Sequence, residues 1–170
     1  MPSLPLHKTL CFLLCLFLHP AHANSPTAGT RQMVYAILSY AKWEQNTPNI
    51  CIVNNPVLAQ QFKSQRSAQH VYKISPLQLD DLKQTSCQAI VFSNLSPREE
   101  QNILNSTVRY PALSISTTNS ACELGSVFCL YQKKNQQYSF RVNMQSLTQS
   151  QIHIDPRVLL LGKNGGLKHE

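Results

Sequence analysis

The sequence predicts an α/β fold in which helices cover both faces of a mixed sheet, and three observations support this. First, short apolar runs alternate with helical segments over residues 30–116, a pattern typical of parallel strands buried on both faces. Second, two strand-like runs flank a polar turn over residues 126–142, which favours an antiparallel hairpin. Third, four cysteines follow residue 23, and in an exported chain they predict two disulfides.

The first 23 residues are predicted to be a cleaved signal peptide. One positive charge, Lys8, precedes an apolar run over residues 10–18, and Pro20 ends the run. Ala21 and Ala23 then provide the small residues of a cleavage site. The run is well short of the ~20 apolar residues that a membrane-spanning helix needs. We therefore expect cleavage after Ala23 and export from the cytosol.

Removing 23 of the 170 residues leaves 147, a length that suits one domain. Residues 24–170 are predicted to form that domain, with residues 163–170 as a disordered tail. The loss of Lys8 lowers the net charge from +7 to +6. The positive residues are scattered, and no basic stripe interleaves with aromatic residues, which argues against nucleic-acid binding.

Helices and strands are expected to alternate up to residue 116. The segment 30–43 has apolar residues at helical spacing, with Thr30 as N-cap. Two later helices begin with a capping residue followed by proline, at Asn55-Pro56 and Ser96-Pro97. A loop or short helix follows Ser75-Pro76. The predicted order is helix 30–43, strand 50–53, helix 57–64, strand 70–74, strand 89–92, helix 98–105 and strand 112–116.

The C-terminal part differs because Tyr138, Phe140 and Val142 alternate with polar residues. These residues predict the second strand of a hairpin, over 137–142, whose first strand covers 126–132. A helix over 143–150 and an extended segment over 152–154 are expected next. Asp155-Pro156 then begins a last helix that runs through Leu161.

Four cysteines allow three pairings, and their positions favour one. Cys51 lies in the first predicted strand and Cys87 just before the third, so neighbouring parallel strands would bring them together. Cys122 and Cys129 flank a short approach to the hairpin. We therefore predict disulfides Cys51–Cys87 and Cys122–Cys129. The sequence has no C-x-x-C, and no histidine at ligand spacing from a cysteine, which disfavours a zinc site or redox catalysis.

Motifs that mark common enzyme classes are missing. The sequence contains no nucleophile elbow, no P-loop and no dinucleotide-binding glycine motif. The acidic pairs Asp80-Asp81 and Glu99-Glu100 are interpreted as solvated surface groups rather than as a general acid and base. We therefore expect a binding protein, without enzymatic activity, cofactor or metal ion.

Four segments together resemble the YfiR family of bacterial periplasmic proteins. They are ILSYAKW at 37–43, NICIV at 49–53, GSVFCL at 125–130, and FRVNMQSL at 140–147 continued by DPRVLLL at 155–161. Both predicted cysteine pairs also fall where the most similar members of the family keep theirs. The sequence departs from the family at Glu44, where proline is usual, and at Gln151, where glycine is usual. The resemblance implies a three-layer α/β/α domain, in agreement with the predicted order of elements.

The resemblance also implies a function. YfiR-like proteins are periplasmic repressors that bind the periplasmic sensor domain of an inner-membrane diguanylate cyclase of the YfiN type. Binding lowers cyclic di-GMP and so affects biofilm formation and motility. An outer-membrane lipoprotein of the OmpA-like type can sequester the repressor, and the family tends to form homodimers. The resemblance therefore implies a periplasmic location for this chain.

A second hypothesis is a periplasmic protein that binds a small ligand without a cyclase partner. Arg141, His153 and Arg157 could contact an anionic ligand, although exposed surface residues are the alternative interpretation. Tyr40 and Trp43 either pack in the core or mark an interface, where such residues are common hot spots. These five residues are the candidate partner- or ligand-binding positions.

Overall fold

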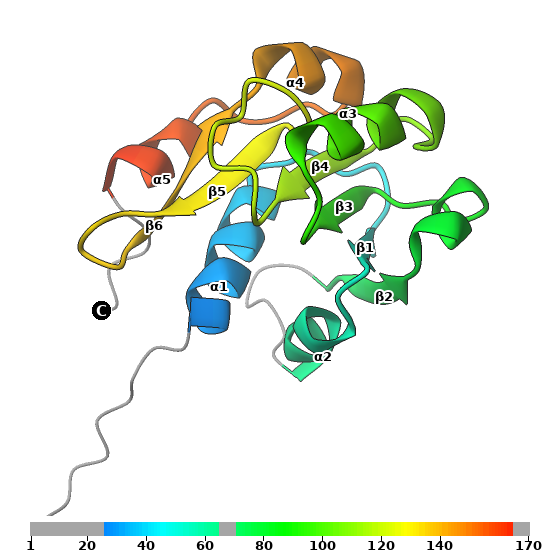
Figure 1. Ribbon diagram of the computed structural model, residues 1–170, viewed down its shortest axis with the longest axis horizontal. Helices are drawn as coiled ribbons and strands as arrows, with labels where there is room; N and C mark the ends of the chain where they lie inside the picture. Colours follow the sequence, from blue (N-terminus) through cyan, green and yellow to red (C-terminus); the bar gives the residue numbers. More distant parts are fainter. Residues whose placement is uncertain (1–25, 65–70, 165–170) are drawn as a thin grey trace, which may run out of the picture.

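The computed structural model describes residues 26–64 and 71–164, and the predicted signal peptide at 1–23 lies outside them. Six strands form one sheet in the order β2-β1-β3-β4-β5-β6 (Figure 1). Strands β1 to β5 pair in parallel and β6 pairs antiparallel with β5, which confirms the predicted mixed sheet. The strands are β1 (Asn49–Val53), β2 (Lys73–Leu77), β3 (Ala89–Phe92), β4 (Leu113–Ser116), β5 (Phe128–Gln132) and β6 (Tyr138–Val142).

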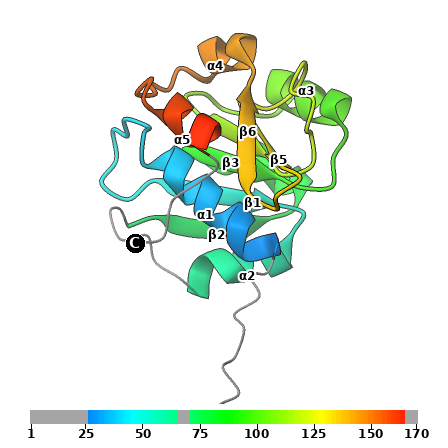
Figure 2. The same ribbon diagram turned by 90° about the vertical axis from the view of Figure 1, so that its left-hand side faces the viewer.

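Helices cover both faces of this sheet, so the domain has the expected three layers (Figures 1 and 2). The helices are α1 (Pro26–Leu38), α2 (Pro56–Ser64), η1 (Leu79–Lys83), α3 (Pro97–Ser106), α4 (Met144–Ser150) and α5 (Val158–Asn164). Along β1, Ile50 and Ile52 pack with α1, α2 and α5, whereas Cys51 and Val53 pack with η1 and α3. This alternation follows from the two-residue period of a strand, since both faces are covered.

Helix α1 ends at Leu38, five residues before the predicted end at Trp43. The helix does not continue because the next residues bond elsewhere. The indole Nε1 of Trp43 donates to the Leu38 carbonyl at 3.1 Å, and the backbone N–H of Lys42 donates to the His153 carbonyl at 2.9 Å. Apolar residues at helical spacing continue to Trp43. The backbone of Lys42 nevertheless leaves the helix, because it bonds His153, which is distant in the chain.

Strand β2 lies further along the chain than predicted. It includes Ser75 and Pro76, whereas the predicted strand ends at Ile74. It is an edge strand that pairs with β1 alone, and a proline is tolerated where one side of the strand needs no backbone donor. The first residue of the predicted strand, His70, lies outside the described residues. At the other end of the chain, α5 continues to Asn164, so Lys163 and Asn164 belong to a helix instead of the predicted tail.

Both predicted disulfides are present. Cys51 in β1 bonds Cys87, which lies just before the neighbouring strand β3. Cys122 bonds Cys129 at the start of β5. The first bridge joins β1 to the residues that lead into the adjacent parallel strand β3, whereas the second closes a loop that leads into the hairpin.

Candidate functional site

A cleft forms where the residues after α1 meet the residues before α5. Ala41 and Ile154 form an isolated antiparallel bridge. Around this bridge, the Lys42 N–H donates to the His153 carbonyl, and the Asp155 N–H donates to the Tyr40 carbonyl, both at 2.9 Å. Two short backbone segments that are distant in sequence are thereby fixed side by side.

The cleft encloses about 530 Å³, and most of its lining is polar. Its lining residues are Ser39, Tyr40, Ala41, Lys42, His153, Asp155 and Arg157. Three of the five candidate residues named from the sequence, Tyr40, His153 and Arg157, therefore lie together. Lysine, arginine and histidine side chains meet one carboxylate there, a composition that suits an anionic ligand.

Arg157 is held in place by Asp155. The guanidinium Nε donates to both carboxylate oxygens of Asp155, at 3.0 and 2.9 Å, and the backbone N–H of Arg157 also donates to Oδ1. These hydrogen bonds lower the pKa of Asp155 to about 2 and raise that of Arg157. The carboxylate therefore stays charged down to strongly acidic pH, and it partly neutralises the arginine that it orients.

The other two candidate residues lie elsewhere. Trp43 packs against the core and donates to the Leu38 carbonyl at the end of α1, and it does not line the cleft. Arg141 lies on β6, where its guanidinium sits 5.1 Å from the centre of the Tyr131 ring and donates to the Ser120 carbonyl. The structure therefore does not group Arg141 with His153 and Arg157 as the sequence suggested.

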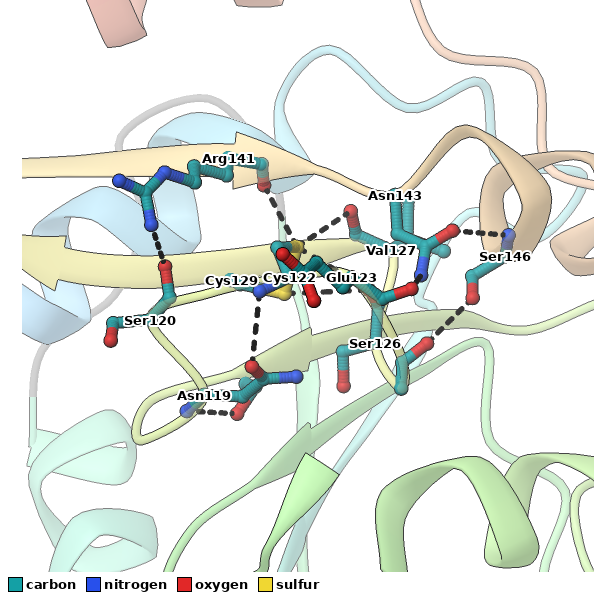
Figure 3. The surroundings of a disulfide bond; sticks show 12 residues. Asn119, Ser120, Cys122, Glu123, Ser126, Val127, Cys129, Arg141, Asn143 and Ser146 are labelled. Carbon is teal, nitrogen blue, oxygen red and sulfur yellow. Dashed lines mark hydrogen bonds between the residues drawn. A yellow bond between two sulfur atoms is a disulfide. The ribbon is translucent and has the colours of Figure 1, made fainter. Parts of the chain in front are cut away.

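Arg141 helps to hold a second feature, the disulfide loop, which we define as residues 119–127 (Figure 3). The Cys122–Cys129 bond closes this loop. Asn119 braces it from within, since its Nδ2 donates to the Leu124 carbonyl at 2.7 Å and its Oδ1 accepts from the Cys122 N–H at 3.1 Å. The loop has no regular secondary structure, so these bonds replace a ladder of backbone hydrogen bonds.

Helix α4 and the residue that precedes it hold the outer side of the disulfide loop. Asn143 Nδ2 donates to the Glu123 carbonyl at 3.3 Å, and Ser146 Oγ donates to the Gly125 carbonyl at 2.6 Å (Figure 3). Leu124 between these anchors is exposed, as is Met144 at the start of α4. The well-anchored loop and the helix beside it thus each present one large apolar side chain to solvent, which is a feature of binding surfaces.

The inner side of the loop rests on a buried carboxylate, that of Glu100 in α3. Ser126 donates to Glu100 Oε2 through its N–H at 3.1 Å and its hydroxyl at 2.9 Å. The Ser116 hydroxyl and Asn119 Nδ2 also donate to this carboxylate. Burial raises the pKa of Glu100, against the opposing effect of these hydrogen bonds. Gly125 is required beside it, because φ is +90° and a Cβ would lie 2.6 Å from Oε2.

Residues 28–163 match the family described as YfiR/HmsC-like. The chain belongs to the YfiR/HmsC-like family. The match covers the whole described sheet, both disulfides, the cleft and the disulfide loop. The resemblance found in the sequence is therefore confirmed at the level of the family.

The geometry of this YfiR/HmsC-like domain corrects one interpretation of the sequence. Glu100 is buried, not solvated as proposed for the pair Glu99-Glu100; Glu99 is the exposed member and completes the capping box with Ser96. The signal was available, since Ile103 and Leu104 follow Glu100 at helical spacings that place all three on one face. Lys42 is a second residue that sequence reasoning did not select, because nothing local indicates its position opposite His153.

The described residues contain neither a cluster of metal ligands nor a membrane-spanning helix. Within residues 26–64 and 71–164, no group of three or more His, Cys, Asp or Glu side chains is placed to hold a metal ion. No helix in the same part of the chain is long and apolar enough to cross a membrane. The YfiR/HmsC-like domain has a polar cleft with three basic side chains and a disulfide-closed loop that, together with α4, exposes Leu124 and Met144.

Proposed function

We propose that this protein is a periplasmic regulator that binds the periplasmic sensor domain of an inner-membrane diguanylate cyclase and inhibits it, lowering cyclic di-GMP. Membership of the YfiR/HmsC-like family over residues 28–163 carries the proposal. The sequence of residues 1–23, which reads as a signal peptide with cleavage after Ala23, supports the location. The activity is a binding function and not catalysis.

The inhibition would work by differential affinity. A membrane receptor with active and inactive conformations shifts toward the one that a ligand binds more tightly. Such a ligand needs a surface that keeps its shape, because ordering a loose segment on binding weakens the complex. The disulfide loop meets this need, since the Cys122–Cys129 bond and hydrogen bonds from Asn119, Asn143 and Ser146 fix its backbone.

The direct test is to co-express the chain with a candidate cyclase from the same genome and to measure cellular cyclic di-GMP. We expect the nucleotide level to fall, and the double variant Leu124→Ser/Met144→Ser to restore it. Val57→Ser is the matched control, because Val57 is as exposed as Met144 but lies on α2. If folded, exported protein leaves the nucleotide level unchanged with each candidate cyclase, the proposal is wrong.

Two further partners follow from the family resemblance. We propose that an OmpA-like outer-membrane lipoprotein sequesters the regulator, and that the regulator is a homodimer. Size-exclusion chromatography with light scattering checks the second proposal, and a monomer at micromolar concentration would contradict it. Co-purification with the lipoprotein, with release of the cyclase, checks the first.

A second candidate function is the binding of a small anionic metabolite in the cleft. It is favoured by the meeting of Lys42, His153 and Arg157 around about 530 Å³ with one carboxylate, Asp155. A thermal-shift screen of phosphate- and carboxylate-bearing metabolites tests it. We expect a stabilising ligand whose effect is lost in Arg157→Ala and kept in Arg98→Ala, since Arg98 lies on α3. No stabilisation by any metabolite would exclude this function.

A further inference from the structure

Helix α5 leaves two leucines uncovered. Val158 is buried against the core, whereas Leu159 and Leu160 remain 51% and 53% exposed. The Leu160 N–H donates to the Arg157 carbonyl at 3.0 Å, so Arg157 and Leu160 are one helical turn apart. Lys163 follows three residues after Leu160, on the same side of the helix. The outward side of α5 therefore carries leucines with a cation at each end, namely Arg157, which is paired with Asp155, and Lys163.

The tip of the β5–β6 hairpin adds positive charge beside the end of α5. Lys133 Nζ donates to the Gly162 carbonyl at 3.2 Å, and the Ser139 hydroxyl donates to the same oxygen at 2.9 Å. These bonds fix the hairpin against the last turn of α5, so Lys133 lies next to Gly162, the residue before Lys163. Lys134 is the next residue of the same turn and is exposed. We define the α5 surface as Arg157, Leu159, Leu160 and Lys163 with Lys133 and Lys134.

Charge is unevenly distributed in this molecule. Between residues 128 and 164, five lysines and arginines accompany a single carboxylate, Asp155. Three exposed carboxylates, Asp80, Asp81 and Glu99, lie on η1 and α3, together with two cations, Lys83 and Arg98. These two helices pack on the opposite face of the sheet from α5 (Figure 2 shows α5 beside α1). The field of the protein would thus turn the α5 surface toward a negative partner.

We propose that the α5 surface docks reversibly on an anionic phospholipid bilayer. Leu159 and Leu160 would enter the boundary between headgroups and acyl chains, and the flanking lysines and Arg157 would contact lipid phosphates. Exposed aliphatic residues ringed by long cationic side chains are typical of interfacial binding. An acidic protein surface would account for the cations but would leave the leucines without an apolar environment, so the bilayer fits both features. Docking of this kind does not require a cyclase.

The test is co-sedimentation of the chain beginning at Asn24 with vesicles of phosphatidylglycerol and phosphatidylethanolamine, compared with phosphatidylcholine vesicles. We expect binding to the anionic vesicles that weakens as salt rises. Lys134→Glu/Lys163→Glu should reduce affinity by at least about 20-fold, since each cation near an anionic surface contributes about fivefold. Leu159→Ser/Leu160→Ser should reduce it by roughly tenfold or more.

Matched controls distinguish binding by the α5 surface from nonspecific binding to vesicles. Val57→Ser/Val71→Ser removes apolar side chains that are more exposed than the leucines, and Lys73→Glu/Lys83→Glu reverses two exposed charges on β2 and η1. Both controls should bind anionic vesicles as the unchanged protein does, and circular dichroism should confirm that all variants fold. Equal binding to both kinds of vesicle, or equal loss in the controls, would overturn the proposal. Because the vesicles contain no protein, neither result bears on cyclase inhibition.

Discussion

The substitution Glu100→Gln tests the buried support of the disulfide loop. The side chain keeps its size but replaces one carboxylate oxygen by an amide that donates. Oε2 accepts from both the N–H and the hydroxyl of Ser126, so the glutamine oxygen is best placed there. The amide then faces the Ser116 hydroxyl, which already accepts from the N–H groups of Thr118 and Asn119. A donor would thus meet a group whose accepting capacity is used.

The expected cost follows from this mismatch. A hydrogen bond to a charged group contributes about 1.5–3 kcal/mol, and a buried donor left without an acceptor costs about 1–3 kcal/mol. Removal of the buried charge also removes its desolvation cost, which offsets part of this loss of stability. We therefore expect Glu100→Gln to lower the free energy of unfolding by about 1–3 kcal/mol, as measured by urea denaturation at pH 7.

The matched control is Glu99→Gln, the same change one residue away. Glu99 is exposed and its carboxylate accepts from the Ser96 N–H at 2.7 Å in a capping box, a role that glutamine also fills. This control should stay within about 0.5 kcal/mol of the unchanged protein. If Glu100→Gln is as stable as the unchanged protein or more so, the cost of burying the charge dominates and the reasoning is refuted.

Three other predictions follow. The pKa of Glu100 is raised by burial. Its contribution to stability is therefore fully present below its unfolded pKa and is lost as pH rises through the folded pKa. The loss of stability in Glu100→Gln should be larger at pH 5 than at pH 7, and urea denaturation at both pH values checks this. Replacing Cys51 and Cys87 by serine should lower the free energy of unfolding by about 4 kcal/mol, and replacing Cys122 and Cys129 by about 2.5 kcal/mol, because the first bridge closes the longer loop. A larger loss for the second pair, measured by urea denaturation, would contradict the loop-closure argument. Trp43→Phe keeps the aromatic packing but removes the donor to the Leu38 carbonyl, so thermal unfolding should show a loss of about 1 kcal/mol, and an unchanged midpoint would show that the hydrogen bond adds nothing.

Local patterns predicted most of the fold. Continuous apolar runs such as Ile50–Val53 indicated parallel strands, and Asn55-Pro56 and Ser96-Pro97 marked the beginnings of α2 and α3. The disulfide Cys51–Cys87 followed from strand adjacency, which the observed pairing of β1 with β3 confirms. These features depend on residues close in sequence or on simple rules of strand order, so sequence reasoning could reach them.

Features set by long-range contacts could not be predicted in this way. The end of α1 at Leu38 depends on pairing of Lys42 with His153, and no local signal reports that contact. The same contact creates the cleft, so the sequence predicts that His153 and Arg157 act together but not that Tyr40 lies beside them. Arg141 looked equivalent to them as a basic residue near the hairpin, but its place on β6 turns it toward Tyr131 and the disulfide loop.

The bridge between Ala41 and Ile154 also bears on the order of folding. Its two halves are separated by most of the chain, and all six strands lie between them in sequence. Contacts of such high sequence separation carry a large loop-closure cost and form late unless the intervening sheet has already shortened the loop. During synthesis or export, which proceed from the N-terminus, the chain would therefore complete the cleft last. Binding of a ligand in the cleft would then indicate that the whole domain, from α1 to α5, has reached its native arrangement.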